Sequence, residues 1–196
     1  MKVYIICGHA ESGKTTFGKK LKEKLKENGY KPCLMQITKP LYHYAEDYFE
    51  WNPRQDEKPR EFLQKFGIDI IRDKLHKDNF LINRLIDDIE ILSEFFDTFI
   101  ITDARFPREI NILKQIFQDV IVIKIERDNY KNNLTEEQNL HTTEKEVDNI
   151  KDYKYLIKNK TYKELDKEIE EILKLEEGEL LWLSQWMDQL DQVKGQ

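Results

Sequence analysis

Cysteine and long apolar runs are both scarce in this chain of 196 residues. The two cysteines, Cys7 and Cys33, are too few for a disulfide framework, and we expect both to be reduced and buried in apolar surroundings. No apolar run approaches the roughly 20 residues that a membrane span requires. The first residues also lack the pattern of a secretion signal. These absences predict a cytoplasmic globular protein without a membrane partner.

Positive charge is scarce as well, because acidic residues outnumber basic ones and the formal net charge is −6. This balance argues against a nucleic-acid polymer as partner, since such a partner requires a positively charged surface. Arginine is the rarer basic residue, with seven arginines against 25 lysines. All seven lie between Arg54 and Arg127. A planar guanidinium binds phosphate through two hydrogen bonds, so this placement suggests a phosphate-bearing ligand near the middle of the chain.

The N-terminal segment has the clearest functional pattern. An apolar run at 3–7 leads into G-H-A-E-S-G-K-T at 8–15, which is the complete phosphate-binding loop G-x-x-x-x-G-K-[ST]. Such a loop turns backbone N–H groups toward a triphosphate at the start of a helix. Lys14 is expected to reach the β- and γ-phosphates, and the Thr15 hydroxyl to bind Mg²⁺. The residues expected to hold the nucleoside triphosphate are Gly8, Glu11, Ser12, Gly13, Lys14, Thr15 and Thr16.

Strand-like apolar runs alternate with helical periodicity along the chain. The runs lie at 2–7, 31–37, 98–103, 119–125 and, more weakly, 153–158; helical periodicity covers 14–28, 40–50, 60–75, 80–96, 107–117 and 161–175. The third and fourth runs are almost continuously apolar, which is typical of a parallel sheet covered on both faces. The sequence therefore predicts an α/β fold, a three-layer P-loop NTPase sandwich around a parallel five-stranded sheet.

The same pattern predicts the domain organisation. Residues 1–175 are expected to form one P-loop domain, in which about 40–96 are a helical substrate-binding insertion and about 128–148 a polar lid. Residues 179–196 are expected to form a C-terminal amphipathic helix. Its apolar stripe fits packing on its own domain, and also a possible homodimer.

The third strand ends at Asp103, on the edge where the phosphate loop also opens. An aspartate there can hold Mg²⁺ through the water shell of the ion, or accept a hydrogen bond from the side of Thr15. The structural alternative is that Asp103 caps the following helix, which carries Glu109. Arg105 is expected to point into the same cleft.

Several segments together resemble the deoxynucleoside monophosphate kinases of bacteriophages and their bacterial relatives, in the adenylate-kinase-like branch of P-loop proteins. Besides the phosphate loop, they are R-E-F-L-Q-K-F-G at 60–67, D-A-R-F-P-R-E at 103–109, Arg127, H-T-T-E at 141–144 and the last strand and helix start at 157–165. The resemblance covers residues 1 to about 175, which it implies are a nucleotide kinase domain. The sequence departs from the family pattern at Phe80, where a tryptophan is usual, and at Thr143, where a serine is usual.

The resemblance implies transfer of the γ-phosphoryl group of ATP to a small acceptor, a (deoxy)nucleoside monophosphate, with Mg²⁺ as cofactor. The residues implied as catalytic are Lys14, Asp103, Arg105 and Arg127, with Thr15 and Asp103 holding the metal. Arg127 is expected to act on the transferred phosphoryl group as the lid closes.

Four residues are candidates for binding the acceptor. Arg60 and Gln64 lie one helical turn apart on one face and are candidates for gripping the nucleotide. Arg105 and His141 are candidates for its phosphate. For Arg72 and Arg84 a surface role fits at least as well.

Two other classes of function are open to a chain with this loop. A GTP-hydrolysing switch protein needs an N-K-x-D loop, and I-K-N-K-T-Y at 157–162 lacks the aspartate. A kinase of another small phosphorylated metabolite, and an inactive nucleotide-binding regulator, share the phosphate loop and stay open.

Overall fold

The computed structural model describes residues 1–56, 59–127, 142–158 and 164–179. The chain forms two compact units, 1–159 and 160–196, and the single P-loop domain expected over 1–175 stays a prediction. The described part of the second unit is one helix, residues 164–179. The predicted C-terminal helix at 179–196 lies outside the described residues beyond its first position. No helix in the described part of the chain is both long and apolar enough to cross a bilayer.

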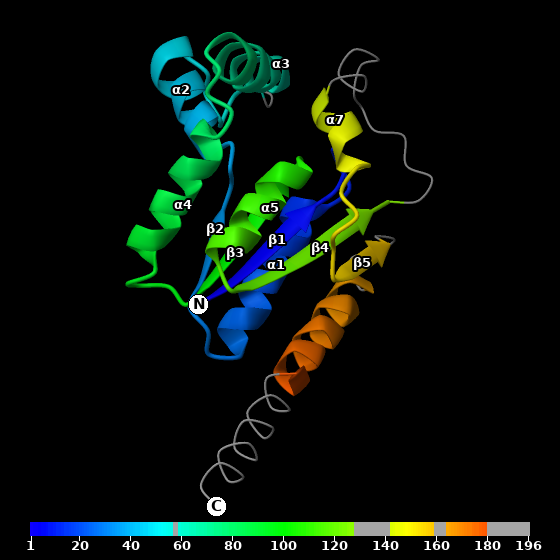
Figure 1. The fold of residues 1–196 in the computed structure, drawn as a ribbon. Helices are drawn as coiled ribbons and strands as arrows, with labels where there is room; N and C mark the ends of the chain where they lie inside the picture. Colours follow the sequence, from blue (N-terminus) through cyan, green and yellow to red (C-terminus); the bar gives the residue numbers. More distant parts are fainter. Residues whose placement is uncertain (57–58, 128–141, 159–163, 180–196) are drawn as a thin grey trace, which may run out of the picture. The chain divides into compact units, whose positions relative to one another are not determined.

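The first unit is built on a parallel sheet of β1 (Lys2–Cys7), β2 (Pro32–Met35), β3 (Thr98–Ala104), β4 (Asp119–Glu126) and β5 (Tyr155–Lys158). The strand order is β2-β3-β1-β4-β5, with every neighbouring pair parallel (Figure 1). This arrangement confirms the predicted α/β fold and five-stranded sheet. The central strands are mostly apolar because helices cover both of their faces.

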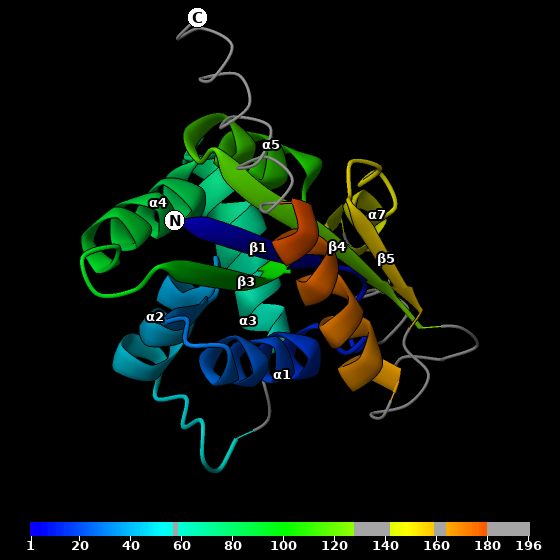
Figure 2. The ribbon, with the colours of Figure 1, turned by 90° about the horizontal axis from the view of Figure 1, so that it is seen from below.

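Helix α1 (Lys14–Glu27) covers one face of the sheet, and α4 (Phe80–Leu92) and α5 (Pro107–Ile116) cover the other (Figures 1 and 2). Alternate residues of β1 therefore enter different cores. Val3 and Ile5 join the core that contains Ile86 of α4. The intervening Ile6 faces α1, where its Cδ1 would lie 3.3 Å from a Cβ placed on Gly18.

The remaining helices lie beyond the carboxyl edge of the sheet (Figure 1). They are α2 (Lys39–Phe49), α3 (Arg60–Gln64), the π-helix η1 (Lys65–Lys74) and α7 (Thr142–Val147). The single helix expected over 60–75 is thus wrong in type after residue 64, because the hydrogen bonds change there to the wider π pattern. Such a change does not alter the apolar spacing enough to be read from the sequence.

Both cysteines are free thiols. Cys7 is buried in β1, and burial raises the pKa of its thiol to about 11. Cys33 of β2 is only partly buried, which corrects the expectation that both are buried. At neutral pH the Cys7 side chain is therefore a protonated, unreactive part of the core.

Candidate active site

The loop between β1 and α1 has the backbone path that a phosphate-binding loop requires. Gly8 has φ 146°, and a Cβ atom there would lie 2.3 Å from the carbonyl oxygen of Ile125. Gly13 has φ 100° at the residue before α1, and Glu11 also has a positive φ of 61°. Gly8 and Gly13 are therefore glycines because both have a positive φ, and because a Cβ at Gly8 would clash with the Ile125 carbonyl oxygen.

Lys14 lies inside the turn of this loop. Its Nζ donates to the carbonyl oxygens of Gly8 at 2.8 Å and His9 at 2.5 Å, and the residue is 7% exposed. The ammonium is thus held at the centre of the loop, beside the backbone N–H groups that would surround a phosphate. Ser12 is buried in the same turn, whereas Thr15 is exposed at the start of α1.

One side of the loop is held by α7. The buried carboxylate of Glu144 accepts a hydrogen bond from the backbone N–H of Ala10, with a distance of 3.0 Å to Oε2, and its Oε1 forms an ion pair with Arg105 Nη1. His9 Nδ1 lies 3.3 Å from Glu144 Oε2, and His9 Nε2 lies 2.8 Å from Asp148 Oδ1. One carboxylate thus joins the phosphate loop to an arginine at the end of β3.

Glu11, also in the phosphate loop, contacts two arginines from other elements. Glu11 Oε1 accepts a hydrogen bond from Arg60 Nη2 of α3 at 2.7 Å. The carbonyl oxygen of Glu11 lies 3.5 Å from Nη1 of Arg127, which follows β4. Arg60 and Arg127, two of the three arginines predicted from the sequence to be functional, are therefore at the phosphate loop. Arg60 reaches the loop through Glu11, at a position that the pattern leaves variable.

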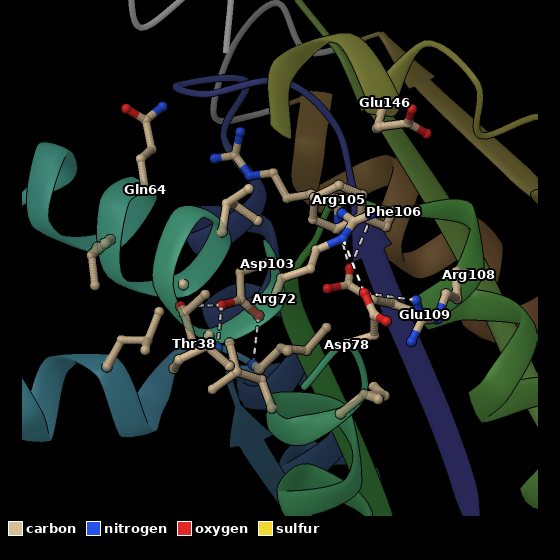
Figure 3. A pocket seen from close by; sticks show the side chains of 18 of the residues that line it. Thr38, Gln64, Arg72, Asp78, Asp103, Arg105, Phe106, Arg108, Glu109 and Glu146 are labelled. Atoms are coloured by element: carbon tan, nitrogen blue, oxygen red, sulfur yellow. Dashed lines mark hydrogen bonds and ion pairs between the residues drawn. The ribbon is translucent and has the colours of Figure 1, made fainter. Parts of the chain in front are cut away.

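A pocket of about 390 Å³ opens beside the loop. Its walls come from the β2–α2 turn, α3 and η1, the β3–α5 segment and α7, and Gln64 and Glu146 lie on opposite sides of it (Figure 3). Four of the residues predicted from the sequence line this pocket, namely Arg60, Gln64, Asp103 and Arg105. Part of the wall is apolar, with Leu63 and Ile71 among the lining residues.

Asp103 is fixed against the β2–α2 turn. Its Oδ1 accepts from the N–H of Ile37 at 2.8 Å, and its Oδ2 accepts from the N–H and the hydroxyl of Thr38 at 3.0 and 2.5 Å (Figure 3). These bonds explain why β2 ends at Met35 and not at the expected residue 37, since the N–H groups that follow serve the carboxylate. The structural alternative for Asp103 is wrong, because the cap residue of α5 is Phe106.

The acid at the start of α5 is Glu109. Its Oε2 accepts from the N–H groups of Arg105 at 2.8 Å and Phe106 at 3.0 Å. Burial raises the pKa of the Glu109 carboxyl to about 7, against the opposing effect of these two hydrogen bonds. Burial also raises the pKa of Tyr42 to about 12, assisted by the Asp103 charge, so the Tyr42 hydroxyl in the pocket is a neutral hydrogen-bond donor near pH 7.

Two pocket arginines were missed by the sequence analysis. The Arg72 guanidinium lies over the Phe106 ring, 4.9 Å from its centroid, and Arg72 Nε lies 3.4 Å from Asp78 Oδ1. Arg108 Nη1 lies 3.5 Å from the same oxygen. Arg108 belongs to the D-A-R-F-P-R-E segment, which was the available signal, whereas nothing in the sequence distinguishes Arg72 from Arg84. Arg84 is exposed and pairs with Asp88 one turn along α4, as a surface role predicts.

Thr15 and Asp103 remain the predicted ligands of a magnesium ion that a nucleotide would largely hold. No three acidic, histidine or cysteine side chains converge within the described residues. Mg²⁺ usually keeps several waters and takes only one or two protein groups besides phosphate oxygens, so such a cluster is not required. The Thr15 hydroxyl is at the loop, and Asp103 Oδ1 retains a lone pair beside its bond to Ile37.

Part of the prediction falls outside the described residues. His141 lies there, and so do residues 128–141 of the expected lid. The remainder of that stretch includes α7, with Glu144 and Val147 buried. The described end of the expected lid is thus a helix in contact with the phosphate loop.

Comparison with known proteins identifies the fold. Neither a family model nor a curated protein sequence matches this chain. A mutant of Mycobacterium tuberculosis APS kinase superposes with a TM-score of 0.51 at 10% identity, over 90% of this chain and 96% of that one. A sugar kinase from Janibacter sp. gives a TM-score of 0.51 at 12% identity, over 86% and 91%. Shikimate kinase from Aquifex aeolicus gives 0.47 at 19% identity, over 92% and 99%. The chain has the fold of the P-loop small-molecule kinases.

Proposed function

We propose that this protein is an ATP-dependent phosphotransferase that converts a (deoxy)nucleoside monophosphate into the diphosphate. The observation that carries the proposal is the pocket beside the phosphate loop, in which Arg60 and Arg105 stand at the border between loop and pocket. A phosphate bound there by these arginines would be next to a triphosphate bound by the loop. Two anionic substrates side by side are what phosphoryl transfer between nucleotides requires.

Phosphoryl transfer needs alignment and charge neutralisation more than covalent chemistry. In this proposal the Lys14 ammonium, already at the centre of the loop, follows the β- and γ-phosphates. Arg127, beside the Glu11 carbonyl, is the candidate for the transferred phosphoryl group. Mg²⁺ bound near Thr15 and Asp103 supplies further positive charge to the phosphates. These residues together lower the cost of bringing two anions into contact.

The pocket suits a nucleotide as acceptor. Leu63 and Ile71 offer an apolar surface for a planar base, and the Gln64 amide and Tyr42 hydroxyl offer hydrogen bonds. The volume of about 390 Å³ is within the range of sites for small organic ligands, roughly 300–1,000 Å³. Arg60 and Arg105 supply charge for the acceptor phosphate.

A second candidate is a kinase acting on another small phosphorylated metabolite. Arg72 and Arg108, which line the same pocket, favour an acceptor with a second anionic group. Both arginines already share Asp78, which neutralises part of their charge. Arg60 and Arg105 are likewise paired, with Glu11 and Glu144, so the apolar wall at Leu63 and Ile71 is what favours a nucleotide as acceptor.

A coupled ADP-release assay across ribo- and deoxynucleoside monophosphates, with phosphorylated sugars and carboxylates added to the panel, tests the proposal. We expect ADP release to depend on one or a few nucleoside monophosphates. Arg60→Ala should raise the KM for that acceptor at least tenfold, whereas Arg84→Ala, on an exposed face of α4, should not. ADP release only with a non-nucleotide acceptor would support the second candidate. ATP binding without acceptor-dependent ADP release would indicate a regulator.

A further inference from the structure

Glu144 is a buried acidic residue that joins two separate parts of the site. Its side chain is 7% exposed, with Oε2 bound by the phosphate loop, including His9 Nδ1 at 3.3 Å, and Oε1 bound by an arginine. Oε2 accepts from the Ala10 N–H of the phosphate loop, and Oε1 pairs with Arg105 Nη1 at the end of β3. A buried carboxylate is costly to desolvate, and full use of both oxygens is what offsets that cost.

The pairing uses only part of the Arg105 guanidinium. In the described structure the hydrogen bonds of this side chain are made by Nη1, and all go to Glu144. Guanidinium carries five donors in a fixed plane, so Nε and Nη2 retain donors for a ligand. Arg105 lines the pocket, and these donors are therefore held beside the space for the acceptor.

The other charges around Arg105 do not provide the same constraint. Asp103 and Glu109 attract the guanidinium, while Arg60 repels it. Asp103 accepts its hydrogen bonds from the β2–α2 turn and Glu109 Oε2 from the N–H groups of the β3–α5 segment, not from the Arg105 side chain. Glu144 is thus the carboxylate that bonds directly to the Arg105 side chain among the described residues.

We propose that Glu144 is a positioning residue for the transfer reaction: it holds the Arg105 guanidinium in register with the phosphate loop, so that acceptor phosphate and donor phosphates are aligned. This inference rests on the proposed function and names a residue that acts through Arg105. Glu144 does not touch either substrate in this role. On the loop side the carboxylate is held by the Ala10 N–H, 3.0 Å from Oε2, and by His9 Nδ1, 3.3 Å from the same oxygen.

Glu144→Gln is the informative change because it affects the hydrogen bond from the Ala10 N–H and the ion pair with Arg105 differently. The amide oxygen of glutamine can still accept from the Ala10 N–H, but the amide has no charge for Arg105. Lys145→Gln is the matched control, since Lys145 is exposed on the same helix. Glu144→Asp is a second variant that keeps the charge but withdraws the carboxylate by one methylene, and it serves if Glu144→Gln does not fold.

A double-mutant cycle with Arg105→Lys measures whether Glu144 acts through Arg105. We expect Glu144→Gln alone to lower kcat/KM for the acceptor about 10- to 100-fold, with a much smaller change in the KM for ATP. In the Arg105→Lys background the same change should cost less than about threefold, because the geometry it protects is already lost. Equal costs in both backgrounds would overturn the proposal, since a purely structural role is additive.

A spectroscopic readout tests the proposal without any activity. In ¹⁵N-labelled protein, the side-chain signals of Arg105, assigned by their loss in Arg105→Lys, should show restricted rotation of the Nη groups. Glu144→Gln or Glu144→Asp should abolish that restriction, and Lys145→Gln should leave it intact. Unchanged Arg105 signals in the Glu144 variants would refute the positioning role even if the enzyme is active. Absence of ADP release in the wild-type protein would instead refute the proposed function. The Arg105 side-chain signals would still decide whether Glu144 holds the guanidinium in place.

Discussion

Single residues set the backbone of the phosphate loop, and Gly8 is the most constrained of them. Gly8→Ala places a Cβ 2.3 Å from the Ile125 carbonyl oxygen at a φ of 146°. We expect the loop to shift, with at least a tenfold loss of affinity for a non-hydrolysable ATP analogue by titration calorimetry. Gly29→Ala is the control, because its φ of 85° imposes similar backbone strain while no atom lies within 4 Å of the added Cβ. That variant should lose about 1 kcal/mol of stability and keep nucleotide affinity. Equal affinity losses in the two variants would show that backbone strain, and not the close approach, determines the loop.

Glu109 gives the protein a pH dependence of known sign. Burial raises the pKa of its carboxyl from 4.5 to about 7, so the folded state binds this proton more tightly than the unfolded state. The free energy of unfolding should therefore fall as pH rises from about 4.5 to 7, by about 1–3 kcal/mol from this group. Glu109→Gln should remove that part of the slope, as urea denaturation at several pH values would measure.

The control for Glu109 is Glu94→Gln, at an exposed position after α4. It should retain the wild-type slope. If Glu109→Gln and the wild type lose stability in parallel between pH 4.5 and 7, the carboxyl of Glu109 does not have the raised pKa.

Residue patterns with a steric or electrostatic reason were predictable, and those that depend on distant partners were not. The positions of Gly8, Gly13 and Lys14 follow from the needs of a bound phosphate. Glu144 was visible only as one letter of H-T-T-E, because its partners Ala10 and Arg105 lie 134 and 39 residues away along the chain. Local spacing contains no information on such contacts.

At the scale of elements, α1 is packed unusually closely on the sheet through Gly18. A Cβ on this residue would lie 2.4 Å from Thr102 Cγ2 and 3.2 Å from Leu34 Cδ1. Alanine favours helix by about 1 kcal/mol over glycine, yet we expect Gly18→Ala to destabilise the protein by about 1–3 kcal/mol, because the helix must move off the sheet. Urea denaturation measures the change.

The companion change Thr102→Ser tests the cause of that loss. Thr102→Ser removes the methyl group that lies nearest to the added Cβ. Gly18→Ala should therefore cost less stability in the Thr102→Ser background than in the wild-type protein. If Gly18→Ala instead stabilises the protein, as alanine does at an exposed helix position, the inference that α1 packs closely on the sheet is wrong.

The long apolar strands were the most predictable elements. β1, β3 and β4 lie within a residue of their expected limits, because burial on both faces gives a continuous apolar run. β2 is shorter than expected, since Asp103 takes the N–H groups of Ile37 and Thr38. The π-helix η1 was not predictable, because its residues keep helical apolar spacing while the hydrogen bonds change to the wider pattern.

At the scale of the whole molecule, we predict that residues 128–148 respond to occupation of the site as a lid. Amide hydrogen exchange compares the free protein with its complex with a bisubstrate analogue that links ATP to a nucleoside monophosphate. Protection should rise at residues 8–16 and across 128–148, because bound phosphates bring negative charge to Arg127 and His141. Increased protection at 8–16 with none across 128–148 would make the stretch an ordinary surface segment.

The central claim is that the phosphate loop and the adjoining pocket transfer a phosphoryl group between nucleotides. The most direct measurement is ³¹P NMR of the protein with ATP, Mg²⁺ and the preferred nucleoside monophosphate, because it observes the bond that forms. The account predicts that the γ-phosphate signal of ATP is replaced by the β-phosphate signal of a new diphosphate. Lys14→Ala should slow this conversion at least 10²-fold with the fold intact, while Lys19→Ala, exposed on the same helix, should not. Free inorganic phosphate without a new diphosphate, or conversion by Lys14→Ala within tenfold of the wild-type rate, would contradict the account.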